Sequence, residues 1–295
     1  MNKLHSLLET HPILLADGAM GTMLFETGLQ FGDPPEVWNI SHPDVVRGIH
    51  RGYLEAGSKI ILTNTFGGSR FRLAMHNLQS RVPELNRTAA LILRAEADAL
   101  GNGALVAGDI GPSGEILAPL GTLEYADAVV GFAEQAGALI GGGVDVIWIE
   151  TMSALEEIRA AFEGVRRISS DIPIITTMTF DTHGRTMMGI TPEQAYKALS
   201  ELGAAAIGGN CGNGPDELLT VVKKMKAVAS PDAVLVAKSN AGLPKLVQGK
   251  AKYDCPPHEM AGFAKDMREA GARIIGACCG STPAHLKEMA GVLLM

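Results

Sequence analysis

Long apolar runs are missing from this chain: no stretch approaches the roughly 18 apolar residues of a membrane-spanning helix. Runs of one charge sign are also missing, and the net charge of −7 comes without any basic stripe of the kind that binds nucleic acid. The N-terminal segment MNKLHSLLETHPILL is interrupted by Glu9 and His11, unlike a secretory signal. We therefore expect a cytoplasmic protein that binds neither nucleic acid nor membranes.

Cysteine is scarce too, with four in 295 residues. In a large chain of cytosolic character, such cysteines indicate metal binding or catalysis rather than disulfides. Cys211 ends the apolar segment AAAIGGNC, and the adjacent Cys278 and Cys279 end the segment ARIIGACC. Cys255 lies in the loop sequence YDCPP, where we interpret it as a surface or packing thiol.

Short apolar runs alternate with longer segments of helical spacing. Such continuous runs are typical of strands that are buried on both faces. There are eight runs: Ile13–Leu15, Lys59–Leu62, Ala104–Ala107, Val144–Ile149, Ile172–Met178, Ala204–Ile207, Ala233–Ala237 and Arg273–Gly276.

Eight strand–helix units predict an α/β protein with the (β/α)8 TIM-barrel fold. The alternative is an open doubly wound sheet, which usually has a Gly-rich phosphate-binding turn after an early strand. Here the glycines 141–143 precede the fourth run, which favours a loop. No linker or low-complexity segment divides the chain, so we expect a single domain over residues 1–295.

The segments between the runs carry helix start signals. Thr191, Pro192 and Gln194 match the N-cap, first position and N3 position of a capping box. Thr282 and Pro283 open the last helix in the same way.

The carboxyl ends of barrel strands meet on one face, where active sites form. In this sequence those ends carry Gly-rich and polar segments: DGAMGT (17–22), TNTFGG (63–68), GDIGPSG (108–114), ETM (150–152), NCG (210–212), SNAG (239–242) and CCG (278–280). The sequence therefore predicts a functional site that is assembled from several strand ends.

Three thiolates with an open fourth position are typical of a zinc centre that activates a thiol. Because successive strand residues point to opposite faces, Cys278 and Cys279 can share an ion only where the strand ends. Gly280 permits that turn, and a glycine also follows Cys211. Asn240, at a neighbouring strand end, is a candidate oxygen ligand in the resting state.

Other interpretations of the cysteines remain open. A buried cysteine is commonly a small hydrophobic residue, and adjacent cysteines can form a redox pair, although a vicinal disulfide is strained. A closed structural zinc site would need a fourth strong ligand. His285 follows Cys279 by six residues, but we expect it on the surface of the next helix.

Asp17 and Glu150 are acids at strand ends in apolar surroundings. Burial raises the pKa of a carboxyl group unless a cation offsets it, and a substrate ammonium would do so. A helix cap or an internal salt bridge is the competing interpretation for Asp17. Asn64 and Thr65 either bind a substrate carboxylate or shape their turn, and His183 fits a hairpin turn without a catalytic role.

With these motifs assembled, the chain resembles the homocysteine S-methyltransferase family over almost its whole length. The family implies a (β/α)8 barrel with a catalytic Zn²⁺ that activates homocysteine as a bound thiolate for methylation to methionine. The segments that carry the resemblance are DGAMGT (17–22), NTF (64–66), GDIGPSG (108–114), IET (149–151), TFDTHGRT (179–186), GGNCGNGPDEL (208–218), SNAGLP (239–244) and GACCGSTPAHL (276–286).

The resemblance implies roles by position. Cys211, Cys278 and Cys279 match the catalytic zinc ligands, and Asn240 matches a possible fourth ligand in the resting state. Asp17 and Glu150 match acids that hold the amino group, and backbone amides near Gly18 and Thr65 match the carboxylate site. The residues matched to substrate binding are Asp17, Gly18, Asn64, Thr65, Glu150 and Asn240.

The resemblance also bears on the methyl donor. GDIGPSGEILAPLGTLEY and SNAGLP are similar to the homocysteine module of cobalamin-dependent methionine synthase. The chain ends at Met295, soon after the last expected helix, so methylcobalamin or a separate methyl-corrinoid protein is the expected donor. Few aromatic residues are present to build a cage for betaine, although Trp38 keeps that donor open.

Several alternatives to this function stay open. One is an enzyme that takes a small donor such as S-methylmethionine or betaine, with homocysteine or selenocysteine as the acceptor. Another is a non-catalytic zinc module that docks on a corrinoid protein. A third is a redox or metal sensor that uses the adjacent thiols.

Overall fold

The computed structural model describes residues 2–243, 245–247 and 250–294. Three positions that enter the predictions lie outside the described residues: Met1 and Met295, which bound the expected domain, and Pro244, which ends the SNAGLP segment.

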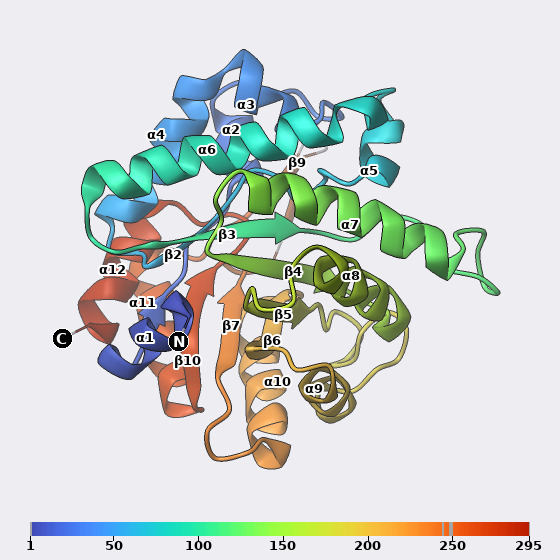
Figure 1. The fold of residues 1–295 in the computed structure, drawn as a ribbon. Coiled ribbons are helices and arrows are strands. Elements are labelled where there is room, and N and C mark those ends of the chain that lie inside the picture. Colours follow the sequence, from blue (N-terminus) through green and yellow to red (C-terminus); the bar gives the residue numbers. More distant parts are fainter. Residues whose placement is uncertain (1, 244, 248–249, 295) are drawn as a thin grey trace.

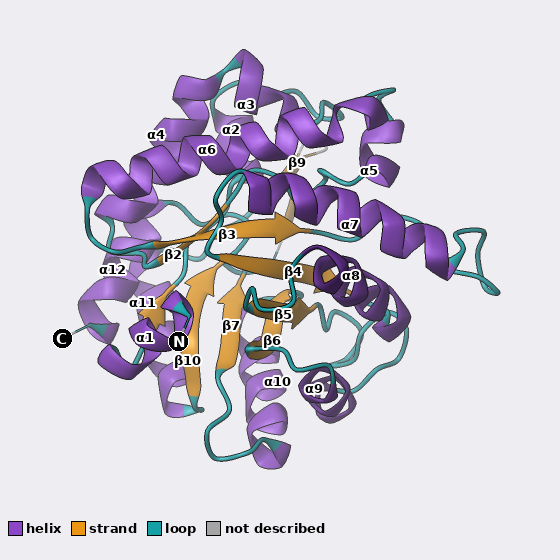
Figure 2. Ribbon diagram, viewed as in Figure 1, coloured by secondary structure: helices purple, strands orange, loops and turns teal. Residues whose placement is uncertain are grey.

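Eight parallel strands form one sheet in the order β1-β10-β7-β6-β5-β4-β3-β2. The order from β10 to β2 can be followed in Figures 1 and 2. A parallel bridge between Ala16 and Ile60 joins the β1 edge to the β2 edge, so the sheet nearly closes into a barrel. The strands are β1 (Leu14–Leu15), β2 (Ile60–Leu62), β3 (Leu105–Ile110), β4 (Val146–Met152), β5 (Ile174–Met178), β6 (Ala206–Cys211), β7 (Leu235–Ser239) and β10 (Ala272–Ala277).

Every predicted apolar run overlaps one of these strands, and the TIM-barrel prediction is confirmed. The loop after β7 holds a small antiparallel hairpin, β8 (Lys245–Val247) with β9 (Lys250–Lys252), which the sequence did not predict.

Helices surround the barrel (Figure 2). Among the described residues, none of them is long and apolar enough to cross a membrane. The helices are α1 (Lys3–Thr10), α2 (Gly21–Glu26), η1 (Pro35–Val37), α3 (Trp38–Ser41), α4 (Pro43–Glu55), α5 (Arg70–Ala74), η2 (Gln79–Arg81), α6 (Val82–Leu100), α7 (Tyr125–Gly141), α8 (Leu155–Ile168), α9 (Pro192–Glu201), α10 (Pro215–Val228), α11 (Pro257–Glu269) and α12 (Pro283–Leu293).

The predicted helix starts are confirmed. Thr191 and Gln194 form both bonds of the capping box at α9, with N–O distances of 3.2 and 3.0 Å. Thr282 caps α12, and its partner is His285, whose Nδ1 accepts the Thr282 amide at 3.1 Å. The expectation of a surface His285 is therefore wrong. The ring is buried because it completes this cap and also lies 3.0 Å from the Cys255 carbonyl oxygen.

The amino-terminal end of the barrel is closed by apolar side chains. Leu4 and Leu8 of α1 pack against the inward-facing Leu14, Ile60 and Leu105 in one buried cluster. The polar strand ends gather at the opposite, carboxyl-terminal end of the barrel, where active sites of this fold form.

Gly208 of β6 provides a test of how tightly adjacent strands pack. A Cβ atom at this position would lie 1.9 Å from the carbonyl oxygen of Val236, which is backbone and cannot rotate away. We predict that Gly208→Ala lowers the free energy of unfolding, measured by urea titration, by at least about 1 kcal/mol.

Gly262→Ala is the matched control, because nothing lies within 4 Å of the added Cβ and the residue is inside α11. This variant should be unchanged or slightly more stable, since alanine favours helix. Equal stability of the two variants would contradict the packing at Gly208.

Candidate functional site

The three predicted cysteine ligands come together at the carboxyl-terminal face. Cys211 ends β6, and Cys278 and Cys279 directly follow β10. Their sulfur atoms all lie within 4.8 Å of one another, and those of Cys211 and Cys278 are 2.7 Å apart. Residues that are 67 positions apart in sequence thus form one half-buried thiol cluster.

Strand register explains this meeting. β7 lies between β6 and β10, and Ser239 of β7 pairs with Cys211 on one side and with Ala277 on the other. The two cysteine segments therefore leave the sheet at the same level. Cys211 and Gly212 both adopt positive φ, 57° and 70°, which turns the chain sharply. Cysteine rarely adopts this conformation, and such strain is characteristic of functional sites.

Asn240 ties the two cysteine turns together. Its Oδ1 accepts the Cys279 amide at 3.1 Å, and its Nδ2 donates to the Gly212 carbonyl oxygen at 2.9 Å. The side-chain oxygen expected to serve as a fourth ligand is thus engaged by the backbone. In this arrangement Asn240 holds the geometry of the thiol cluster.

The cluster fits a soft, tetrahedral metal ion. Two sulfurs that are each about 2.3 Å from a tetrahedral Zn²⁺ lie roughly 3.8 Å apart. The three ligand atoms here lie within 4.8 Å of one another, and the 2.7 Å between the Cys211 and Cys278 sulfurs is shorter than that spacing. Three sulfur donors favour Zn²⁺ over hard cations, which prefer oxygen.

The thiols also influence one another. Hydrogen bonds from Cys211 and Cys278 lower the pKa of Cys279 well below its ordinary value. The hydrogen bond to Cys278 raises the pKa of Cys211. Cys279 is therefore the most acidic thiol of the cluster.

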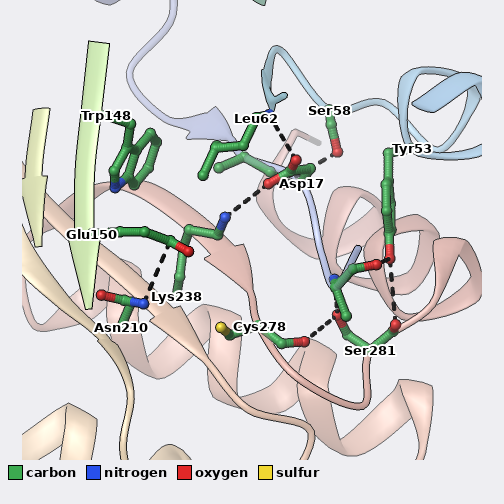
Figure 3. Close-up of polar contacts among 12 residues, drawn as sticks. Asp17, Tyr53, Ser58, Leu62, Trp148, Glu150, Asn210, Lys238, Cys278 and Ser281 are labelled. Atoms are coloured by element: carbon green, nitrogen blue, oxygen red, sulfur yellow. Dashed lines mark hydrogen bonds and ion pairs between the residues drawn. The ribbon is translucent and has the colours of Figure 1, made fainter. Parts of the chain in front are cut away.

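An ion pair lies inside the barrel near the thiols (Figure 3). Asp17 Oδ1 is 2.8 Å from the ammonium of Lys238, and its Oδ2 accepts the Leu62 amide at 2.8 Å. The Lys238 ammonium also lies 5.1 Å from the centroid of the Trp148 ring. The internal salt bridge considered for Asp17 is thus what the structure contains. Burial alone would lower the pKa of Lys238, but the charges of Asp17 and Glu150 outweigh it and raise that pKa.

Glu150 lies near the end of β4, next to a residue with a constrained backbone. The next residue, Thr151, has a φ of 60°, which is costly for a β-branched side chain. Asn210 holds this turn: its Oδ1 accepts the Thr151 amide at 2.9 Å, and its Nδ2 donates to Thr151 Oγ1 at 2.6 Å. The same Nδ2 lies 3.4 Å from Glu150 Oε2, a weak contact that leaves the carboxylate available.

Gly18 and its neighbours link the first strand to the cysteine pair. The Ser281 hydroxyl accepts the Ala19 amide at 3.0 Å and donates to the Cys278 carbonyl oxygen at 2.7 Å (Figure 3). The Tyr53 hydroxyl donates to the Ala19 carbonyl oxygen at 2.6 Å. A Cβ at Gly18 would lie 2.5 Å from Ser281 Oγ, so only glycine fits in this turn.

Asn64 and Thr65 use their side chains within the protein. Asn64 Nδ2 donates to the Pro35 carbonyl oxygen at 2.8 Å, and Thr65 Oγ1 donates to the Asp109 carbonyl oxygen at 2.7 Å. The sequence left open whether these two side chains bind a substrate carboxylate or shape their turn. These contacts favour the second interpretation. Cys255 packs against the hydrophobic core, and His183 lies in a tight turn closed by the Thr182–Arg185 bridge.

Sequence reasoning missed Lys238. It directly follows the predicted run Ala233–Ala237, and β7 (Leu235–Ser239) extends past that run to include it. The signal was present: Lys238 is two residues before Asn240 and two after the inward-facing Val236, so alternation places it inside the barrel.

Glu150 gives a prediction for pH dependence. Burial raises its pKa from the ordinary 4.5 to about 8, although Lys238 opposes the shift. Between these values the unfolded chain loses the proton while the folded protein keeps it, so this group lowers stability as pH rises. Glu150→Gln removes the effect. Without homocysteine, its stability relative to the parent protein should increase from about pH 5 to about pH 8 in urea titrations. A difference that is constant with pH would show that Glu150 is not buried in this way.

Comparison with known proteins agrees with this architecture. The family model described as homocysteine S-methyltransferase matches residues 14–293. Methionine synthase of Mycobacterium tuberculosis is 35% identical over 95% of the chain, and that of Mycobacterium leprae is 34% identical over 97%. The chain spans only 24% and 25% of the lengths of these two relatives.

Solved structures share the fold. The homocysteine methyltransferase MmuM from Escherichia coli superposes with a TM-score of 0.83 in its oxidized form and 0.82 in its metallated form. Both are 22% identical in sequence; they cover 99% and 98% of this chain and 99% of their own chains. Because the family model matches nearly the whole chain, this protein belongs to the homocysteine S-methyltransferase family.

Proposed function

We propose that this protein is a zinc-dependent S-methyltransferase that binds homocysteine as a thiolate and methylates it to methionine. The observation that carries the proposal is the cluster of Cys211, Cys278 and Cys279, whose ligand atoms lie within 4.8 Å of one another at the open end of the barrel. Membership of the family supports the reaction class.

The three cysteines would hold Zn²⁺ as thiolates and leave one position for the substrate sulfur. A free thiol has a pKa of about 8.5 and is mostly protonated at neutral pH, and binding to the metal would release its proton. The substrate sulfur then forms a bond to the methyl carbon while the bond from that carbon to the donor breaks. Asn240 and the glycines of the two turns keep the sulfurs in place.

The remaining ends of homocysteine need partners of their own. We propose that buried carboxylate side chains at the strand ends bind the amino group. The family resemblance implies that these are Asp17 and Glu150. The Thr65 amide donates to the Thr63 carbonyl oxygen at 2.9 Å, so we place the substrate carboxylate at the Gly18 turn. Asn64 and Thr65 would support this site through the contacts of their turn.

For the donor we propose a methyl-corrinoid, either free methylcobalamin or a separate corrinoid protein. The support is the match to methionine synthases that are about four times as long as the aligned segment, together with the motifs after β3 and β7. Trp38 is the aromatic residue that could have helped to bind betaine as a methyl donor. Its ring stacks on His42 with a centroid distance of 4.2 Å. One face of its indole is thus already covered.

The metal assignment predicts a specific pattern among cysteine variants. The purified protein should hold about one zinc per chain. Cys211→Ala, Cys278→Ala and Cys279→Ala should each lose zinc and methyl transfer while keeping the circular dichroism of the barrel. Cys255→Ala is the matched control and should keep both, because this thiol packs against the core outside the cluster. Methyl transfer by the triple variant would contradict the proposal.

A donor panel with homocysteine tests the rest of the proposal. Methylcobalamin should support methionine formation, whereas S-methylmethionine, S-adenosylmethionine and betaine should not. Turnover with betaine alone would instead establish a small-donor enzyme. Zinc binding without turnover from any donor would indicate a docking module, and thiols without metal would indicate a redox sensor.

A further inference from the structure

Tyr253 reaches the thiol cluster from the loop that joins β9 to α11. Its hydroxyl is hydrogen-bonded to the sulfur of Cys279. Its half-buried side chain lies against the turn that follows the cysteine pair, because a Cβ atom added at Gly280 would be 2.2 Å from Tyr253 Cγ. The ring and the hydroxyl therefore contact the same turn, and a residue larger than glycine at this position would displace the ring.

The segment that carries Tyr253 is fastened on two sides. The amide of Cys255, two residues further on, donates to the Ala241 carbonyl oxygen at 3.1 Å, and the Cys255 carbonyl oxygen lies 3.0 Å from His285 Nε2. Ala241 donates its own amide to the Cys279 carbonyl oxygen at 2.9 Å. These contacts tie the segment to the loop after β7, to α12 and to the cysteine pair. The position of the Tyr253 hydroxyl is thus set by the elements that also hold the cluster.

The proposed reaction requires the protein to distinguish between similar sulfur atoms. Three of the sulfurs around the metal would belong to Cys211, Cys278 and Cys279, and the fourth to the substrate. Each would be a thiolate that can attack a methyl group. Methylation of a cysteine would damage the site, so the protein's sulfurs need to be poorer nucleophiles than the substrate sulfur.

A hydrogen bond to a metal-bound thiolate supplies such a difference. The donated proton draws electron density from the sulfur and occupies one of its lone pairs, so the sulfur reacts more slowly with an electrophile. Residues that hydrogen-bond to metal ligands also fix the orientation of those ligands. Cys211 has a side-chain donor from outside the cluster as well, since Asn210 Nδ2 lies 3.6 Å from its sulfur.

We propose that Tyr253 is a positioning residue that donates a hydrogen bond to the metal-bound Cys279 thiolate and directs the methyl group to the substrate sulfur instead. This inference rests on the proposed function and adds a residue to it. The Tyr253 hydroxyl keeps its proton throughout, and no bond to its oxygen forms or breaks during methyl transfer.

The first test measures which sulfur is methylated when zinc-loaded protein is treated with methyl iodide. The sulfur forms a bond to the methyl carbon and iodide leaves, which imitates the transfer step. Tyr253→Phe keeps the ring against Gly280 but removes the donor. Peptide mass spectrometry should show that methylation of Cys279 accelerates by roughly fivefold, the factor expected for one lost hydrogen bond. The rates at Cys211 and Cys278 should change much less.

Tyr125→Phe is the matched control. It makes the same substitution in α7, at a tyrosine whose hydroxyl donates to Glu163 at 3.0 Å outside the cluster. Cys279 in this variant should react at the parent rate, and both variants should hold as much zinc as the parent protein. An unchanged Cys279 rate in Tyr253→Phe would overturn the inference. Equal acceleration at all three cysteines would also overturn it, because it would indicate a loosened cluster rather than one lost hydrogen bond.

The second test replaces zinc with Co²⁺, whose absorption spectrum reports the bonding of its thiolate ligands. Loss of the hydrogen bond makes the Cys279 thiolate more electron-rich, so its charge-transfer band in the near ultraviolet should move to longer wavelength in Tyr253→Phe. The band should stay in place in Tyr125→Phe. A role limited to packing would leave the band unmoved in both variants, and that result would contradict the inference.

Failure of the proposed function would look different. The parent protein would then form no methionine from homocysteine with any methyl donor. The methyl iodide comparison needs neither homocysteine nor the natural donor, so it would still decide whether Tyr253 protects Cys279.

Discussion

The alignment of β6, β7 and β10 is the constraint on which the rest of the site depends. Ser239 of β7 pairs with Cys211 on one side and Ala277 on the other, so the two thiol-bearing segments leave the sheet together. Asn240 then spans the gap between them with two hydrogen bonds. A slip of one residue in either pairing would turn a cysteine away from the cluster, because side chains alternate between the faces of a strand.

A group of buried charged side chains lies inside the barrel near the thiols. Asp17, Asp109 and Glu150 bring three acids into the barrel, and Lys238 compensates one of them. A substrate ammonium is the natural complement to what remains, since a buried carboxylate without a cation is driven toward its neutral form. Under the proposed function, the cysteines would bind the sulfur of an amino-acid thiol and the acids would bind its amino group.

Sequence reasoning predicted the strands and the thiol cluster because both leave local signals: continuous apolar runs, and cysteines followed by glycines such as Gly280. It did not predict the partners of these residues, which depend on long-range packing. Lys238 lies just beyond the predicted run Ala233–Ala237 and was given no role, and Asp109 was placed at a strand end without a role. His285 was expected at the surface, yet its ring caps α12 and is buried. Pairings across the barrel become visible only once the strand order is known.

The most direct test of the central claim is zinc K-edge X-ray absorption of the zinc-loaded protein, before and after homocysteine is added. The cluster of Cys211, Cys278 and Cys279 predicts three sulfur ligands and one lighter ligand in the resting protein. Addition of homocysteine should replace the lighter ligand with a fourth sulfur. A coordination shell that stays unchanged while methionine is formed would contradict activation of the thiol at this metal site.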